Sequence, residues 1–74
     1  MFRGFVETSY SKLERLFGHR IIENGKISWT VVVKDKEYMI YDFLPFELSQ
    51  FKHKWRVNSE FKDLSDLEEF IKMS

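Results

Sequence analysis

The sequence has no cysteine, one proline and three glycines, and its twelve basic residues balance its twelve acidic ones. The lack of cysteine excludes a disulfide scaffold, a thiolate zinc site and a cysteine nucleophile, and it fits a reducing compartment. A net charge of zero provides no overall field to attract nucleic acid or an anionic membrane. The chain also lacks a signal-peptide pattern and any apolar run of membrane-spanning length. We therefore predict a cytoplasmic protein without membrane contact.

What the sequence has in abundance is aromatic side chains: eight Phe, three Tyr and two Trp among 74 residues. A chain of this length has room for one hydrophobic core, so we predict a single domain over residues 1–74. Aromatic rings bury much area for little side-chain entropy, which suits a small core. So many rings cannot all lie inside it, however, and we expect some on a contact surface or a homodimer interface.

The first half of the chain predicts a strand, a helix and a hairpin. A short strand over 2–7 is followed by a helix over 10–17, with Thr8 or Ser9 as its N-cap and Gly18 as its C-terminal cap. Apolar and polar residues then alternate over 26–34 and again over 37–43, which is typical of half-buried strands. The polar residues between them predict a turn, so these two strands form a hairpin.

The second half predicts a further strand and a second helix. Alternation over 52–58 indicates the strand, and the stripe of Leu64, Leu67, Phe70 and Ile71 indicates the helix. Ser65 and Glu68 have the spacing of a capping box at its start. A further short helix is predicted at 45–51. The fold class is α+β: a small antiparallel sheet of three to four strands with two helices packed on one face, in the order β-α-β-β-β-α.

The titratable residues form no pattern typical of an active site. His19 and His53 lie in no nucleophile–base motif, and we interpret both as structural or solvent-facing. Glu68 and Glu69 point in different directions from a helix, which makes them poor acid–base partners. Metal-binding spacings and a glycine-rich phosphate loop are also missing. We therefore predict that the protein is not an enzyme and has no catalytic, cofactor-binding or metal-binding residues.

Three surfaces remain as candidates for binding. The first is acidic: residues 1–56 carry ten basic and seven acidic side chains, whereas residues 57–74 carry two basic and five acidic ones. Such an end either solvates a helix and complements its dipole, or docks on a basic surface. A protein channel that holds DNA is one such surface, because DNA presents closely spaced negative charge. The acidic residues are Glu60, Asp63, Asp66, Glu68 and Glu69.

The second surface is apolar, and the third is basic. Leu44, Phe46, Leu48 and Phe51 either cover the core or form a partner or homodimer interface. Lys52, Lys54 and Arg56 share one strand face and would suit a phosphate backbone, which makes a small nucleic-acid-binding module the alternative function. Their alternation turns Trp55 away from them, and exposed strand lysines also prevent edge pairing. Together with the zero net charge, this argues against direct nucleic-acid binding.

A set of short motifs resembles a known group of proteins. The motifs are Thr8-Ser9-Tyr10-Ser11-Lys12-Leu13 running into Leu16-Phe17-Gly18, then Ile27-Ser28-Trp29, Met39-Ile40-Tyr41-Asp42 and Trp55. They resemble small α+β proteins of bacteriophages and other large DNA viruses, and within that group the sliding-clamp inhibitors of Twort-like staphylococcal phages. The resemblance covers about two thirds of the chain.

The resemblance implies a host-takeover protein, acting in the bacterial cytoplasm, that binds the DNA polymerase sliding clamp and blocks DNA from it. The usual clamp-binding peptide has a Gln followed shortly by a Leu-Phe-type pair. The sequence has one Gln, Gln50, and the residues after it do not fit. A clamp inhibitor of this kind would therefore use a folded surface. We expect the acidic surface described above to face the DNA channel, and the protein to act as a homodimer. An anti-defence protein that binds another host factor remains an alternative.

Overall fold

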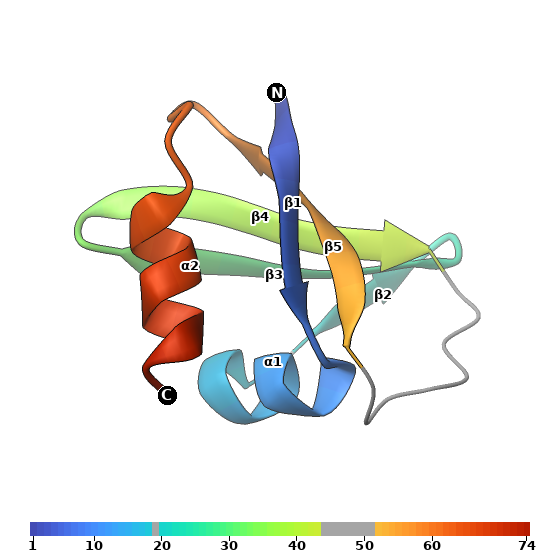
Figure 1. Ribbon diagram of the computed structural model, residues 1–74. Coiled ribbons are helices and arrows are strands. Elements are labelled where there is room, and N and C mark those ends of the chain that lie inside the picture. Colours follow the sequence, from blue (N-terminus) through green and yellow to red (C-terminus); the bar gives the residue numbers. More distant parts are fainter. Residues whose placement is uncertain (19, 44–51) are drawn as a thin grey trace.

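The computed structural model describes residues 1–18, 20–43 and 52–74, and in these residues it has five strands and two helices (Figure 1). Along the chain they are β1 (Phe2–Thr8), α1 (Tyr10–Phe17), β2 (Ile21–Glu23), β3 (Lys26–Val33), β4 (Lys36–Phe43), β5 (His53–Ser59) and α2 (Ser65–Lys72). The α+β class is confirmed. The predicted short helix at 45–51, with Leu44, Phe46, Leu48 and Phe51, lies outside the described residues, and so does His19.

The strands form one antiparallel sheet in the order β1-β5-β4-β3-β2. The last strand of the chain, β5, therefore lies between the first strand and β4. The prediction of three to four strands was too low, because it missed the short edge strand β2. Its three residues are all exposed, so no apolar alternation marks it, and it pairs with only the first three residues of β3. Beyond Ser28, β3 is consequently an edge strand on that side.

Two tight turns join the strands on either side of β3. The β2–β3 turn has Asn24 and Gly25 at φ values of 52° and 76°, the left-handed pair that two-residue hairpins prefer. The β3–β4 turn places Lys34 and Asp35 in the same region, with φ values of 50° and 63°. The second turn thus adopts a conformation that favours glycine without having one.

The first helix begins and ends at the signals seen in the sequence. Ser9 is the N-cap, and its hydroxyl accepts a hydrogen bond from the backbone N–H of Lys12 at 3.1 Å. Gly18 has a φ of 75°, and its N–H donates to the carbonyl of Glu14 at 2.9 Å. Leu13 is fully buried against the sheet.

The start of the second helix differs from the prediction. The helix begins at Ser65, whose backbone N–H donates to the carboxylate of Asp63 at 2.8 Å, and the N-cap Leu64 makes no side-chain cap bond. The predicted capping box from Ser65 to Glu68 was therefore wrong. The apolar stripe was correct for Leu64, Leu67 and Ile71, which are buried, but the Phe70 side chain is 42% exposed.

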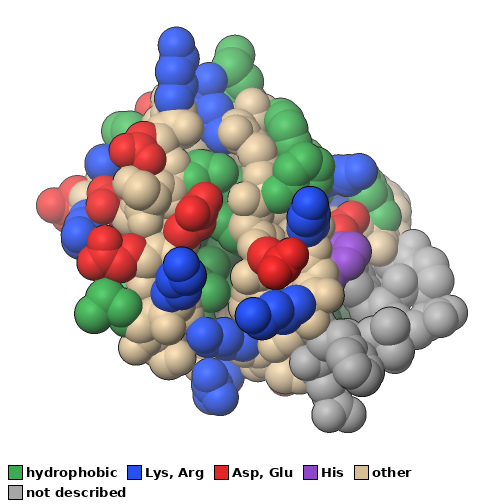
Figure 2. Space-filling view, viewed as in Figure 1, with side chains coloured by type: hydrophobic (Ala, Val, Ile, Leu, Met, Phe, Trp, Pro, Cys, Tyr) green, Lys and Arg blue, Asp and Glu red, His purple; other side chains and the backbone are tan. Residues whose placement is uncertain are grey.

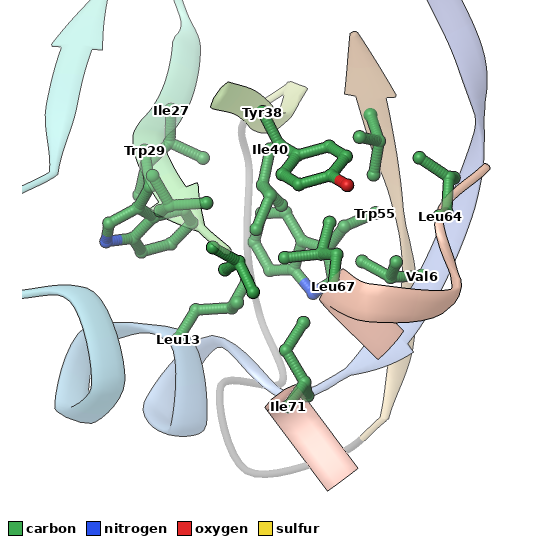
Figure 3. Packing of buried hydrophobic residues seen from close by; sticks show 13 residues of the cluster. Val6, Leu13, Ile27, Trp29, Tyr38, Ile40, Trp55, Leu64, Leu67 and Ile71 are labelled. Atoms are coloured by element: carbon green, nitrogen blue, oxygen red, sulfur yellow. The ribbon is translucent and has the colours of Figure 1, made fainter. Parts of the chain in front are cut away.

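Both helices pack on the same face of the sheet, over a single cluster of buried side chains (Figures 1 and 3). Trp29 and Trp55 lie at its centre, with ring centroids 5.4 Å apart in an edge-to-face arrangement. Each indole N–H has a partner: Trp29 donates to the Gly18 carbonyl at 3.3 Å and Trp55 to the Thr8 carbonyl at 3.0 Å. The buried apolar residues are Val6, Leu13, Ile27, Trp29, Val31, Val33, Tyr38, Ile40, Trp55, Val57, Leu64, Leu67 and Ile71.

Candidate partner-binding surfaces

The five acidic residues of 60–69 lie in and just before α2, but they do not act alike. In Figure 2 acidic side chains gather on the side of the molecule where α2 lies, with basic side chains between them. Asp66 receives the ammonium groups of Lys36 at 2.9 Å and Lys34 at 3.5 Å, and its side chain is 23% exposed. The Lys36 hydrogen bond, opposed by burial, holds the pKa of Asp66 below its ordinary value.

Asp63 is also committed to the fold. Its carboxylate accepts the backbone N–H of Ser65, and this hydrogen bond lowers the pKa of Asp63. By contrast, Glu60, Glu68 and Glu69 are exposed and make no ion pair with any residue in the described ranges. The structure therefore divides the predicted acidic surface into two residues that hold α2 in place and three that are available to a partner.

An apolar groove lies beside Glu69, and the sequence did not predict it. Val32 and Val33 of β3 and Phe70 and Met73 of the C-terminal segment line it, with Glu69 at its rim. Val32 is 66% exposed and Met73 79%, whereas Phe70 stacks on Phe17 with ring centroids 5.7 Å apart. The alternation of the strand could have predicted that Val32 is exposed, because its side chain must point away from those of Val31 and Val33. Glu69 lines this groove, whereas Glu68 lines a hollow with Lys12, Lys52 and Lys72. We call Glu60, Glu68, Glu69 and this groove the acidic end.

The predicted basic surface is brought together only in part. Lys54 and Arg56 alternate with the buried Trp55 and Val57, so both point away from the helices. Lys52 precedes β5 and instead lines a hollow with Lys12 and Lys72. The three residues therefore do not form one continuous row.

The sheet face opposite the helices carries aromatic rings beside the cations. In the register, Phe5 and Tyr41 flank Arg56 on neighbouring strands, and Lys26 lies opposite Phe43. The Arg56 guanidinium carbon is 6.0 Å from the Phe5 ring centroid and 5.8 Å from that of Phe43. The Lys26 ammonium lies 5.5 Å from the Tyr41 ring centroid. We call these five residues, with Phe2 packed edge-on against Phe5 at 5.3 Å, the aromatic–cationic patch.

The one histidine that the structure describes is held by a carboxylate. The His53 ring hydrogen-bonds Asp42, whose other oxygen lies 4.0 Å from Arg56, and the ring packs edge-on against Trp55 at 5.2 Å. Asp42 therefore joins the start of β5 to the end of β4. Within the described ranges, acidic and histidine side chains form no cluster of three that would hold a metal ion. No helix within the same ranges has the length and hydrophobicity that a membrane crossing requires.

The motifs that carry the resemblance form the framework of the fold. Ser9 caps α1, Gly18 ends it, and Trp29, Ile40 and Trp55 fill the core. They determine the scaffold, whereas the acidic end and the aromatic–cationic patch lie largely outside them. Comparison with protein-family models, with curated proteins and with solved structures finds no match to this chain.

Proposed function

We propose that this chain is a bacteriophage host-takeover protein that binds the bacterial DNA polymerase sliding clamp and blocks DNA loading. The observation that carries the proposal is the acidic end, where Glu60, Glu68 and Glu69 are exposed and have no ion pair within the described residues. A channel that encloses DNA must offer positive charge to the phosphates. An acidic protein surface can occupy the same place, and its charge speeds the encounter.

The groove beside Glu69 supports a protein partner that makes apolar contacts as well as electrostatic ones. Phe70 and Met73 present apolar surface directly next to Glu69. Interfaces commonly combine a desolvated aromatic or Met anchor with a charged rim. In this arrangement Phe70 anchors the complex, while Glu69 beside it sets the orientation.

Binding to the purified clamp tests the proposal. Surface-bound clamp is titrated with the wild-type chain and with Glu68→Lys/Glu69→Lys, at 50 and 300 mM NaCl. We expect the double reversal to lower the association rate at low salt by about tenfold or more, because steering is lost. Glu23→Lys, which reverses an exposed acid on β2, is the matched control and should leave the rate near the wild-type value. Asp66 is left intact because it holds α2.

The named partner is tested by capture from host lysate with the tagged chain, followed by mass spectrometry. Recovery of the clamp with the wild type, and its loss with the double reversal, is expected. Recovery of a different host factor, with no clamp, rejects the clamp and favours the anti-defence alternative. A loading assay on primed circular DNA then measures whether the bound clamp still encircles DNA.

We further propose that the active form is a homodimer. The exposed Ile21 and Ile22 of the edge strand β2 support this, because an exposed apolar edge strand is a typical association site, and neither residue lines the groove. Light scattering after gel filtration distinguishes the 9.0 kDa chain from a species of twice that mass. A monomer at every concentration up to about 100 μM would reject the dimer without affecting clamp binding.

A further inference from the structure

We propose that the aromatic–cationic patch binds single-stranded nucleic acid, with bases stacking on Phe5 and Phe43 and phosphates contacting Arg56, Lys26 and Lys54. The patch is distinct from the acidic end and does not depend on clamp binding. Neither helix covers it, since Leu13, Leu67 and Ile71 all pack on the opposite face of the sheet.

The first support is the exposure of the rings. Phe5 is 49% and Phe43 55% exposed, although the same strands bury Val6, Tyr38 and Ile40 almost completely. Two exposed phenylalanine rings on an antiparallel sheet provide flat apolar surface that a nucleobase can cover. Stacking of bases on aromatic side chains is sequence-tolerant because every base has a π-face. Sheets with exposed rings serve this purpose in single-stranded RNA recognition.

The second support is the position of the cations. Arg56 lies between the two rings, within 6.0 Å of each centroid, and its side chain is 40% exposed. The Lys26 ammonium lies over the Tyr41 ring, and Lys54 lies two residues before Arg56 on the same strand face. A single strand whose bases stack on these rings would therefore place its phosphates close to these cations.

The positive charge of the patch also favours nucleic acid over a second copy of the chain as its partner. A twofold contact centred on the patch would bring the Arg56 and Lys26 charges of two copies together, and like charges at an interface are costly. A single-stranded polyanion neutralises the same charges instead. Three acids temper the attraction: Asp42 lies 4.0 Å from Arg56, Glu7 pairs in register with Lys54, and Glu23 with Lys26. We therefore expect moderate affinity that depends strongly on salt.

Fluorescence anisotropy with labelled dT20 tests the site, with a labelled 20-base-pair duplex in parallel. We expect dT20 to bind in the micromolar range at 20 mM NaCl and more tightly than the duplex. Three phosphate contacts predict that log K falls with log salt with a slope of about −2. No anisotropy change with either probe up to 100 μM protein at 20 mM NaCl overturns the proposal.

Variants then locate the site. Phe5→Ala/Phe43→Ala should weaken dT20 binding by about a hundredfold, since each of the two lost base stacks is worth about a factor of ten. Arg56→Gln should weaken it and reduce the salt slope by about 1. Lys62→Gln, which removes an exposed cation between β5 and α2 and outside the patch, is the matched control and should bind like the wild type. Wild-type affinity in both patch variants overturns the proposal.

A titration of the isotope-labelled wild-type chain with dT20, followed by amide chemical shifts, does not depend on how the variants fold. We expect the largest changes in β1, β4 and β5, and smaller ones in α2. Changes confined to α2 overturn the assignment. So does a Phe5→Ala/Phe43→Ala chain that turns from dimer to monomer by light scattering while dT20 binding is unchanged, because the patch would then be a self-association surface.

Discussion

The two faces of the sheet use their aromatic residues in opposite ways. On the helix-covered face, Trp29 and Trp55 are each 1% exposed, contact each other and donate their indole N–H groups to main-chain carbonyls. On the other face, Phe5 and Phe43 are about half exposed and have a guanidinium group between them. The number of aromatic rings in a small domain therefore does not measure the size of its core. For the rings on strands, alternation decides which ones enter the core and which ones lie on the surface.

Removal of a ring from the helix-covered face should have the largest effect on stability. Trp29→Ala should destabilise the protein by about 3–5 kcal/mol, because a large cavity opens in the core and the Gly18 carbonyl loses its partner. A domain of this size has roughly 4–11 kcal/mol of stability, so the variant should lose a large share of it. Urea denaturation followed by far-ultraviolet circular dichroism measures the change. A loss below about 1 kcal/mol would contradict the central role of this indole.

The corresponding change on the open face should be much smaller. Phe5→Thr keeps a strand-forming residue while it removes an exposed ring, so the loss should stay below about 1 kcal/mol, the scale of one cross-strand pair. The same urea titration measures it. A loss comparable with that of Trp29→Ala would show that the Phe5 ring belongs to the core.

Substitutions in the two hairpin turns should change stability without altering either face of the sheet. Asp35→Gly should stabilise the protein by about 0.5–1 kcal/mol, because Asp35 has a φ of 63°, where glycine is favoured. Gly25→Ala in the β2–β3 turn is the matched reverse and should destabilise it by about 1 kcal/mol, since φ there is 76°. Thermal unfolding of both variants measures the two shifts, and equal signs would contradict the argument.

Strand alternation and helix caps predicted most of the fold. They predicted α1 with its bounds and caps, the β3–β4 hairpin, and the direction of Trp55 away from the basic face, because these depend on local periodicity. They missed β2, because three exposed residues carry no period and only pairing with β3 defines them as a strand. They also misplaced the start of α2, because the Asp63 carboxylate rather than a Ser65–Glu68 box satisfies the first turn.

The candidate surfaces were less predictable for the same reason. The acidic residues were visible in the sequence, but only tertiary contacts showed that Asp66 is paired with lysines of the β3–β4 hairpin, 30 and 32 residues earlier in the chain. The aromatic–cationic patch depends on the register between β1, β5 and β4, which joins Phe5, Arg56 and Tyr41 from distant parts of the chain. Neither relation has a local signature.

The smallest expected effect is a pH dependence of the contact between the hairpin and α2. Asp66 has a lowered pKa in the folded protein and Lys36 a raised one, chiefly because of their mutual hydrogen bond. The Asp66 contribution is therefore complete above the ordinary pKa of aspartate, about 3.9, and is lost as pH falls through the lower folded value. The Lys36 contribution is complete below the ordinary lysine pKa, about 10.4, and is lost as pH rises through the higher folded value.

Asp66→Asn isolates this contribution, because it removes the charge and keeps the shape. The wild type should exceed the variant in urea midpoint by a small, constant amount between about pH 5 and 9, and the difference should shrink below about pH 4 and above about pH 10.5. Glu69→Gln, an exposed acid of the same helix without an ion pair among the described residues, should show almost no difference at any pH. An Asp66→Asn difference that stays constant from pH 2.5 to 7 would contradict the ion pair as its source. A difference that shrinks would establish that Asp66 serves the fold, and would leave Glu60, Glu68 and Glu69 as the acids free to meet a partner.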